Sequence, residues 1–395
     1  MKSKNMLILL VFFVVLSIKL AYSQVYWIEQ TSPTQKELTK SLFVDPEYGW
    51  VIGDSGTVIR TTNSGANWIV QPTGIFSSEL KDITFISRSS GWIIANDSTY
   101  KTFILRTTNS GVNWIKQYYP DTTIILNTIF FIDQFTGFVS GYNGEIYRTT
   151  NSGANWKTCN FDTSSCLYLF PKNDILFVNP QTGYSCGGVL DLQGVFIKTT
   201  DAGSNWFSQC ISGEPMNEIV DLGGGRVAVM GGDFDLGSIF AISSNYGSNW
   251  QYEPTGCFGN ATSFSFRTPA EVWAALSFSG LLAVNLDSMK PGSQWICLDA
   301  PSNIPINSIK FLSPTVGYAF GGQGKIYKYN QSVIGLQNNQ ISPSEFSLEQ
   351  NYPNPFNPAT HFKFGIADLG FVRLIVYDVL GKEVAILINK QMQPG

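Results

Sequence analysis

The stretch RTTNSGANW at Arg60–Trp68 decides the fold, because the chain repeats it. It returns as RTTNSGVNW at 106–114 and unchanged as RTTNSGANW at 148–156. With tryptophan as the reference position, the intervals between repeats are 41, 46, 42, 50, 44 and 45 residues, and the tryptophans are Trp27, Trp68, Trp114, Trp156, Trp206, Trp250 and Trp295. A period of this length is typical of solenoids and propellers.

Most repeats share the same four parts. An apolar stretch such as 42–44 comes first, and a glycine–aromatic pair such as Gly49-Trp50 follows it. A strand led by glycine, as at 56–60, comes next, and the Thr-Asn-Gly-Trp turn closes the unit. Four short strands per repeat make the blade of a β-propeller. Only 14% of the residues are charged, and turn residues punctuate the whole chain, so we predict an all-β fold.

The two ends of the repeat array complement each other. The last repeat begins at 306 and lacks the terminal tryptophan strand, whereas Trp27–Gln30 reads like Trp68–Gln71 with no strand in front of it. We therefore predict a seven-bladed β-propeller over residues 24–331 that is closed by its N-terminal strand. Closure would hide sheet edges that an open array exposes. A linear solenoid is the alternative, although solenoids usually end in polar capping units.

The repeated turn is interpreted as a structural clip. Asn63 and the neighbouring hydroxyls can bond nearby backbone groups, Gly65 can adopt positive φ, and Trp68 begins the outer strand and packs against the blade. The positions assigned to this clip are Thr61, Asn63, Gly65 and Trp68 in the first repeat, and then Asn109, Gly111, Trp114, Asn151, Gly153, Trp156, Asp201, Gly203, Trp206, Asn245, Gly247 and Trp250.

The turn resembles the Asp-box of BNR-type propellers. Together with the glycine–aromatic pair, it is most similar to the repeat of propellers related to the photosystem II assembly and stability factor. The resemblance implies a propeller in which the turn lies at the blade periphery, away from any site. Secreted relatives with this repeat occur in bacteria that use the type IX secretion system.

The N-terminal segment reads as a signal peptide over residues 1–23. Lys2 and Lys4 precede an apolar run from Met6 to Ile18, and Ala21-Tyr22-Ser23 fits a cleavage site. A membrane anchor is the alternative, but this run is shorter than the roughly 20 apolar residues that a span needs. We expect export and no integral membrane segment in the mature chain.

The six cysteines, which lie between Cys159 and Cys297, can form disulfides in an exported chain. Cys159 and Cys166 are close enough in sequence to form a bridge, and buried free thiols are the alternative. There is no CxxC motif, and His361 is the only histidine, so a zinc site is not expected.

The C-terminal part differs from the repeats. Residues 332–348 read as a linker, and 349–395 as the outline of a small β-sandwich whose later two strands lie at 372–376 and 383–388. This segment is similar to the type A C-terminal sorting domain of type IX secretion, and it stops before the further strands of that family, so we expect a partial domain. The motif residues are Asn351, Tyr352, Pro353, Asn354, Pro355, Phe356, Asn357, Pro358, Tyr377, Asp378 and Gly381.

The sorting domain implies that the partner in export is the type IX secretion machinery. The expected location is therefore the medium or the outer-membrane cell surface, reached through the periplasm.

No residue is predicted to be catalytic, to bind a cofactor or to ligate a metal. Arg60, Arg106 and Arg148 share one repeat position and are interpreted as outer-strand residues rather than a substrate-binding triad. The segment 233–237 faintly resembles a calcium loop but lacks the later ligands. Acids considered for a two-carboxylate glycosidase are Asp54, Asp97, Glu145, Asp233 and Asp235.

The functional hypothesis is a non-catalytic binding propeller, acting as a monomer on an extracellular protein or glycan. The chain without residues 1–23 has 22 basic and 29 acidic residues, a net charge of −7, which argues against nucleic acid. The alternatives are a polysaccharide hydrolase and an assembly factor for a membrane complex. The loops expected to bind are 74–81, 118–126, 213–216 and 256–262.

Overall fold

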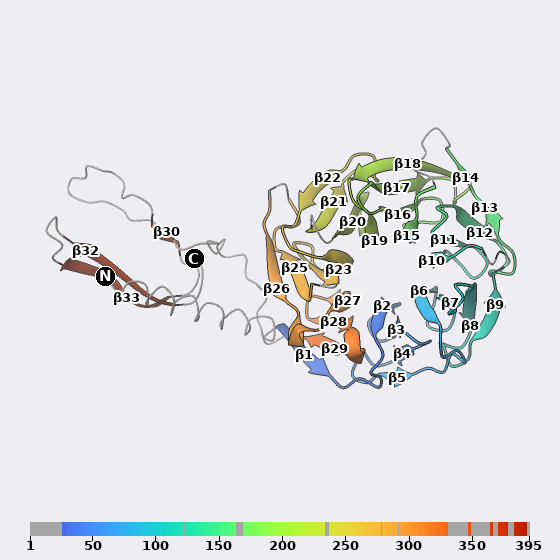
Figure 1. Cartoon of the computed structure of the whole chain (residues 1–395), viewed down its shortest axis with the longest axis horizontal. Helices are drawn as coiled ribbons and strands as arrows, with labels where there is room; N and C mark the ends of the chain where they lie inside the picture. Colours follow the sequence, from blue (N-terminus) through green and yellow to red (C-terminus); the bar gives the residue numbers. More distant parts are fainter. Residues whose placement is uncertain are drawn as a thin grey trace. The chain divides into compact units, whose positions relative to one another are not determined.

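The computed structural model describes residues 26–119, 121, 123–162, 169–233, 237–277, 279–290, 292–330, 347–348, 364–365, 370–377 and 383–392. The chain divides into two compact units, 1–333 and 334–395. Figure 1 shows that the sheets of the first unit form a closed ring. The predicted all-β, seven-bladed propeller is thereby confirmed.

Each blade is an antiparallel sheet whose strands follow one another outward from the ring axis. The first three blades consist of β2 (Leu38–Phe43), β3 (Gly49–Gly53), β4 (Val58–Thr61) and β5 (Ile69–Val70); β6 (Glu79–Phe85), β7 (Gly91–Asn96), β8 (Thr102–Thr107) and β9 (Ile115–Tyr118); and β10 (Leu126–Phe131), β11 (Gly137–Gly141), β12 (Ile146–Thr149) and β13 (Lys157–Thr158).

The fourth blade gains a fifth strand, because β14 (Asn160–Phe161) crosses from the third blade and pairs in parallel with β18. The fourth to sixth blades consist of β15 (Lys172–Phe177), β16 (Gly183–Val189), β17 (Gln193–Thr199) and β18 (Asn205–Ser212); β19 (Met216–Gly223), β20 (Arg226–Asp233), β21 (Gly237–Ser243) and β22 (Gln251–Pro254); and β23 (Asn260–Thr268), β24 (Glu271–Ser277), β25 (Leu281–Asn285) and β26 (Trp295–Asp299).

The N-terminal strand closes the ring. β27 (Ile306–Ser313), β28 (Val316–Gly321) and β29 (Ile326–Tyr329) form the inner part of the seventh blade, and β1 (Trp27–Gln30) pairs antiparallel with β29. The register joins Trp27 to Tyr329 and Gln30 to Ile326. Trp27 is 3% exposed, and its ring meets that of Trp273, in the sixth blade, edge-on at 5.6 Å. The prediction that the N-terminal strand completes the seventh blade is therefore confirmed.

The repeated turn is closed by its own side chains. The hydroxyl of Thr61 accepts a hydrogen bond from the Gly65 N–H at 2.9 Å and donates one to Asn63 Oδ1 at 3.0 Å. Asn63 Oδ1 also accepts from the Asn67 N–H at 3.0 Å, and Gly65 has a φ of 67°. The same bonds recur in the turns that begin at Thr107, Thr149, Thr199 and Ser243. The Oδ1 atoms of Asn63 and its counterparts therefore accept their hydrogen bonds within the turn.

The turn tryptophans lie between consecutive blades. Trp206 is fully buried, and its ring contacts Phe138 of the preceding blade at 6.2 Å and Phe177 of its own blade at 5.9 Å. A Cβ on Gly203 would stand 2.2 Å from the Phe138 ring, so this turn must carry glycine. The glycine–aromatic pair of one blade thus packs against the turn of the next. This contact explains why the two motifs occur together in the repeat.

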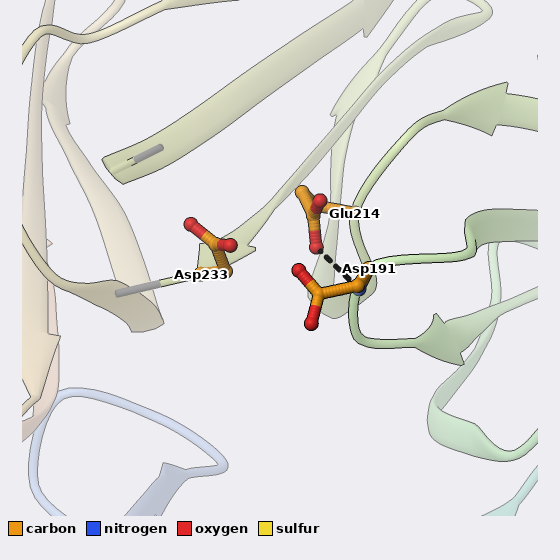
Figure 2. Close-up of side chains that lie close together, drawn as sticks. All are labelled: Asp191, Glu214 and Asp233. Atoms are coloured by element: carbon orange, nitrogen blue, oxygen red, sulfur yellow. Dashed lines mark hydrogen bonds between the residues drawn. The ribbon is translucent and has the colours of Figure 1, made fainter. Parts of the chain in front are cut away.

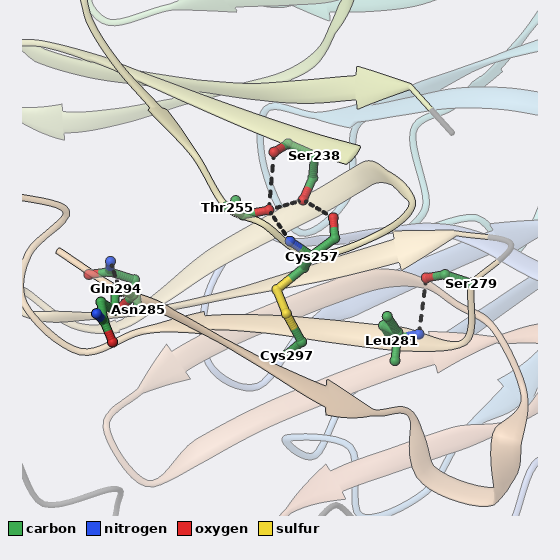
Figure 3. The surroundings of a disulfide bond; sticks show 8 residues. All are labelled: Ser238, Thr255, Cys257, Ser279, Leu281, Asn285, Gln294 and Cys297. Carbon is green, nitrogen blue, oxygen red and sulfur yellow. Dashed lines mark hydrogen bonds between the residues drawn. A yellow bond between two sulfur atoms is a disulfide. The ribbon is translucent and has the colours of Figure 1, made fainter. Parts of the chain in front are cut away.

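A disulfide joins Cys257 to Cys297 within the sixth blade, with a Cα–Cα separation of 5.6 Å. It fastens the loop before β23 to the outer strand β26, beside the hydrogen-bonded pair Ser238 and Thr255 (Figure 3). The predicted Cys159–Cys166 bridge is wrong, because Cys159 is a free, buried thiol; Cys166 lies outside the described residues. Cys159 packs instead in the apolar cluster between the third and fourth blades.

In the second unit, two strand pairs are described. β30 (Ser347–Leu348) pairs antiparallel with β31 (Phe364–Gly365), and β32 (Gly370–Tyr377) pairs antiparallel with β33 (Glu383–Met392). Tyr377 is the last residue of β32. Residues 1–23, most of the linker, 351–358, Asp378 and Gly381 lie outside the described residues. Within the described part of the chain, none of the helices has the length and apolar character of a membrane span.

Replacing Trp206 by alanine tests the inter-blade contact. We expect the free energy of unfolding to fall by about 3–5 kcal/mol, because a fully buried large side chain is removed. The neighbouring Phe207→Ala is the matched control, since Phe207 lies in the same strand and is 54% exposed, and it should change stability by less than about 0.5 kcal/mol. Chemical denaturation of both variants measures the difference, and equal losses would contradict the packing described.

Removing the disulfide tests its contribution. Cys297→Ser should lower the free energy of unfolding by about 2–4 kcal/mol, since the bridge links residues 40 apart and restricts the unfolded chain. Cys210→Ser, at an exposed free cysteine, is the control. If both variants melt at the wild-type temperature under non-reducing conditions, the bridge does not form.

Candidate functional site

The propeller has two unlike faces. The loop face carries the connections that lead into the first strand of each blade and those between the second and third strands. The turn face carries the remaining connections, including all of the Thr-Asn-Gly-Trp turns. The loops predicted to bind, 74–81, 118–126, 213–216 and 256–262, belong to the loop face by this topology.

Two rings of side chains surround the axis near the loop face. The innermost strand of every blade has a register irregularity at the same place, which brings two consecutive residues to the axis. The outer ring consists of Thr39, Lys81, Asn127, Asn173, Asn217, Thr262 and Asn307. The inner ring consists of Lys40, Asp82, Thr128, Asp174, Glu218, Ser263 and Ser308.

Three carboxylates of the inner ring join their blade to the next. Asp82 Oδ2 accepts from the Ile129 N–H at 2.8 Å, Asp174 Oδ2 from Ile219 at 2.9 Å, and Glu218 Oε2 from Phe264 at 2.6 Å. In each pair the donor belongs to the innermost strand of the following blade. These bonds satisfy N–H groups that face the axis and have no neighbouring strand.

The outer ring makes a second set of bonds between blades. The amide of Asn173 donates to the Met216 carbonyl at 3.0 Å, and that of Asn217 donates to the Ala261 carbonyl at 2.8 Å. Asn307 closes the same contact between the seventh and first blades. Most ring residues are therefore committed to holding blades together.

The buried charges of the inner ring differ in their partners. Lys40 lies 2.8 Å from Asp82 and 3.8 Å from Asp174; burial opposes its charge, but the two carboxylates raise the Lys40 pKa overall. Burial raises the pKa of Asp174 to about 6, with Lys40 acting against this rise. Burial also raises the pKa of Glu218 to about 7, although Lys310 lowers it. Near neutral pH the axis thus holds carboxyls that titrate.

A funnel opens from these rings to the loop face. Its cavity has a volume of about 450 Å³. The residues that line it include Lys40, Glu218, Glu37, Glu79 and three asparagines of the outer ring, Asn173, Asn217 and Asn307. Its walls are polar and carry both signs of charge. The funnel can accept water, a small polar group or one side chain of a larger ligand.

Three carboxylates gather on the loop face between the fourth and fifth blades. Asp191, Glu214 and Asp233 each place an oxygen within 4.8 Å of the others, and the Asp191 N–H donates to Glu214 Oε2 at 3.2 Å (Figure 2). Burial, followed by the charges of Asp233 and Asp191, raises the pKa of Glu214. Oxygen atoms at this spacing could hold a divalent cation or receive a basic group. Asp235, also considered from sequence, lies outside the described residues.

Large apolar side chains are exposed in many loops of this face. Phe76 is 84% exposed and Tyr118 is 75% exposed. The others, all more than two-fifths exposed, are Tyr100, Tyr142, Leu169, Leu190, Leu192 and Phe258. Exposed apolar groups gathered on one face mark interaction sites.

The repeated arginines do not converge. Arg60 is the cross-strand partner of Trp50, Arg106 of Trp92, and Arg148 of Phe138, each in a different blade. The guanidinium of Arg106 lies 5.7 Å from the Trp92 ring centre. Arg148 likewise lies over the Phe138 ring, whereas the Arg60 guanidinium donates to the Ser110 carbonyl at 3.0 Å. All three arginines pair with a neighbouring strand of their own blade and do not form a substrate-binding triad, as the sequence interpretation held.

Sequence reasoning missed the axial rings and the carboxylate cluster. The rings leave a readable signal, since the innermost strands read LTKSLF, LKDITF, LNTIFF, KNDILF and MNEIVD, with polar residues at the same two positions. The cluster leaves no such signal, because its members come from three separate segments, two loops and the end of strand β20.

Comparison with known proteins supports the fold. No family model matches the chain. The photosystem II assembly lipoprotein Ycf48 of Synechocystis sp. is 41% identical over 71 residues, which cover 18% of this chain and only about a fifth (20%) of that relative. The structure of YCF48 bound to D1 peptide has a TM-score of 0.59 and 20% identity, covering 77% of this chain and 96% of that one.

The chain is a seven-bladed β-propeller that resembles Ycf48. YCF48 from Cyanidioschyzon merolae gives a TM-score of 0.61 at 17% identity, over 78% of this chain and 99% of that one. The GH74 xyloglucanase from Xanthomonas campestris gives 0.59 at 12%, over 77% of this chain and 53% of that chain. At these identities the structural likeness shows the fold alone.

The pH dependence of stability tests the buried Glu218. An unfolded glutamate has a pKa near 4.5, so the folded chain binds more protons than the unfolded chain between about pH 4.5 and 7, and stability should fall as pH rises through this window. Glu218→Gln should flatten that fall, whereas Glu79→Gln, an acid at the funnel mouth, should keep the wild-type slope. Urea denaturation at several pH values measures this, and an unchanged slope in Glu218→Gln would contradict the assignment.

Proposed function

We propose that this chain is a non-catalytic binding propeller that contacts its ligand through the loop face. The main support is a difference in role between the polar residues that recur from repeat to repeat and the residues that differ from one loop to the next. The repeated polar groups form hydrogen bonds within the turns and the axial rings, and Arg106 and Arg148 lie over aromatic rings of their own blades. On the loop face, by contrast, unlike loops present large exposed apolar side chains. The three clustered carboxylates also lie there, with Asp191 exposed and Glu214 and Asp233 buried. The structure of YCF48 with a D1 peptide is consistent with a protein ligand for such a fold.

A polysaccharide hydrolase is the second candidate, favoured by the carboxylate cluster and by the likeness in fold to a GH74 xyloglucanase. A two-carboxylate glycosidase places its acids on opposite sides of the scissile bond, roughly 5–10 Å apart. Asp191, Glu214 and Asp233 lie instead side by side in adjacent loops, within 4.8 Å of one another (Figure 2). This arrangement supports binding better than cleavage.

An assembly factor for a membrane complex is a special case of the same binding role. A contiguous arginine patch would favour it, and the described loops of the loop face contain no arginine. We therefore keep the broader proposal of an extracellular protein or glycan ligand, bound by a monomer.

Binding and hydrolysis are separated by assaying the purified full chain on immobilised glycans and proteins and on soluble polysaccharides including xyloglucan. We expect retention of a ligand and no release of reducing sugar. Release of sugar that is abolished in Glu214→Gln but kept in Asp54→Asn, a control at another acid of the loop face, would overturn the binding proposal.

We also propose that residues 1–23 and 349–395 direct export through the type IX secretion system to the medium or cell surface. In a bacterium that has this machinery, removal of residues 349–395 should leave the propeller in the periplasm. Surface display or release of the shortened chain at the wild-type level would refute this route.

A further inference from the structure

We propose that the loop face of blades two to five binds an extended segment of another protein in which basic side chains alternate with large apolar ones. This inference rests on the proposed binding function and names its partner class. It is carried by two properties of the same loops, exposed apolar side chains and an excess of carboxylates, which together select a cationic, apolar ligand.

The apolar component is spread along an arc. Tyr100 lies between the second and third strands of blade two, Tyr142 occupies the same connection in blade three, and Leu190 and Leu192 occupy it in blade four. Tyr118 and Leu169 lie in or beside the connections between these blades. Burial of such side chains under a partner is favourable, by about 25 cal/mol for each Å² removed from water. Because they come from successive blades, an extended segment fits them better than a compact contact.

The acidic component occupies the same loops. Asp97 accompanies Tyr100, Asp121 follows Tyr118, and Glu145 follows Tyr142. Asp191 stands between Leu190 and Leu192, and its neighbours Glu214 and Asp233 complete the carboxylate cluster. The exposed basic residues of the corresponding described loops and strand ends are Lys101 and Lys116. The arc therefore carries six carboxylates, of which those of Glu214 and Asp233 are buried, against two exposed lysines.

Two of these acids, Asp97 and Asp121, have pKa values below the usual range for aspartate. Hydrogen bonds from Thr99 lower the pKa of Asp97, and those from Thr123 lower the pKa of Asp121. The donors of these hydrogen bonds are hydroxyl and N–H groups, and the charge of Lys101 also acts on Asp97. On the turn face, by contrast, Arg88 pairs with both Asp45 and Glu47.

Carboxylates beside aromatic rings recognise basic side chains in two ways. A lysine or arginine can form a charge-assisted hydrogen bond to the carboxylate and place its charge over the ring. Glycans can stack on Tyr100 or Tyr142, but a neutral sugar gains nothing from the one-signed charge around them. Anionic segments would be repelled.

The test measures binding of short labelled peptides to the full chain by fluorescence anisotropy. The probe alternates lysine and leucine; one comparison peptide replaces lysine by glutamate, and the other replaces leucine by serine. We expect the lysine–leucine peptide to bind at least about tenfold more tightly than either comparison peptide, and to weaken as salt is raised.

Paired variants locate the surface. Tyr142→Ser combined with Leu192→Ser should weaken the lysine–leucine peptide by about tenfold or more. Phe135→Ser is the matched control, because Phe135 lies on the turn face with 53% exposure, close to the 56% of Tyr142, and it should leave binding unchanged. Asp191→Asn should weaken binding of the same peptide and reduce its salt dependence.

The outcomes separate the inference from the proposed function. Equal binding of the lysine and glutamate peptides, no binding of any peptide, or an equal loss in Phe135→Ser overturns the inference. If a glycan or an acidic protein is bound through the loop face instead, the inference fails while the binding function stands. The proposed binding function itself would be overturned by cleavage of a polysaccharide by the purified chain.

Discussion

Closure of the ring by β1 is the constraint on which the other features depend. The strand contributes the outer edge of the seventh blade, and its tryptophan packs against the aromatic cluster of Trp273, Phe311 and Tyr329 at the boundary with the sixth blade. Without this strand, the outer edge of β29 would be unpaired. Residues about three hundred positions apart are thereby neighbours, and the loops of all seven blades are brought to one face.

Two kinds of contact between blades stabilise the closed ring, one at its periphery and one near its axis. At the periphery, glycine turns and tryptophans pack into the preceding blade. At the axis, carboxylates, hydroxyls and amides bind backbone groups of the following blade. The axial contacts are costly, since burying Asp174 and Glu218 raises their pKa values to about 6 and 7. They are retained at positions where backbone N–H groups would otherwise face the axis without partners.

Sequence reasoning succeeded where one physical requirement recurs. The glycine at position 65 is needed for a left-handed turn and a close approach, and its repetition with Trp68 reveals the period, the blade count and the closure. Arg60 and its counterparts were understood for the same reason. Sequence reasoning failed where two residues become neighbours only because the closed ring brings their segments together. The Cys257–Cys297 bridge joins residues 40 apart, and Asp191, Glu214 and Asp233 meet only because blades four and five are adjacent.

Hydrogen exchange of the native chain tests closure most directly. Trp27–Gln30 form the pairing partner of Ile326–Tyr329, so their hydrogen-bonded amides should exchange as slowly as those of β29 and lose protection in the same cooperative transition. If the amides of β1 exchange at the rate of an unfolded chain while β29 stays protected, the ring is not closed by this strand.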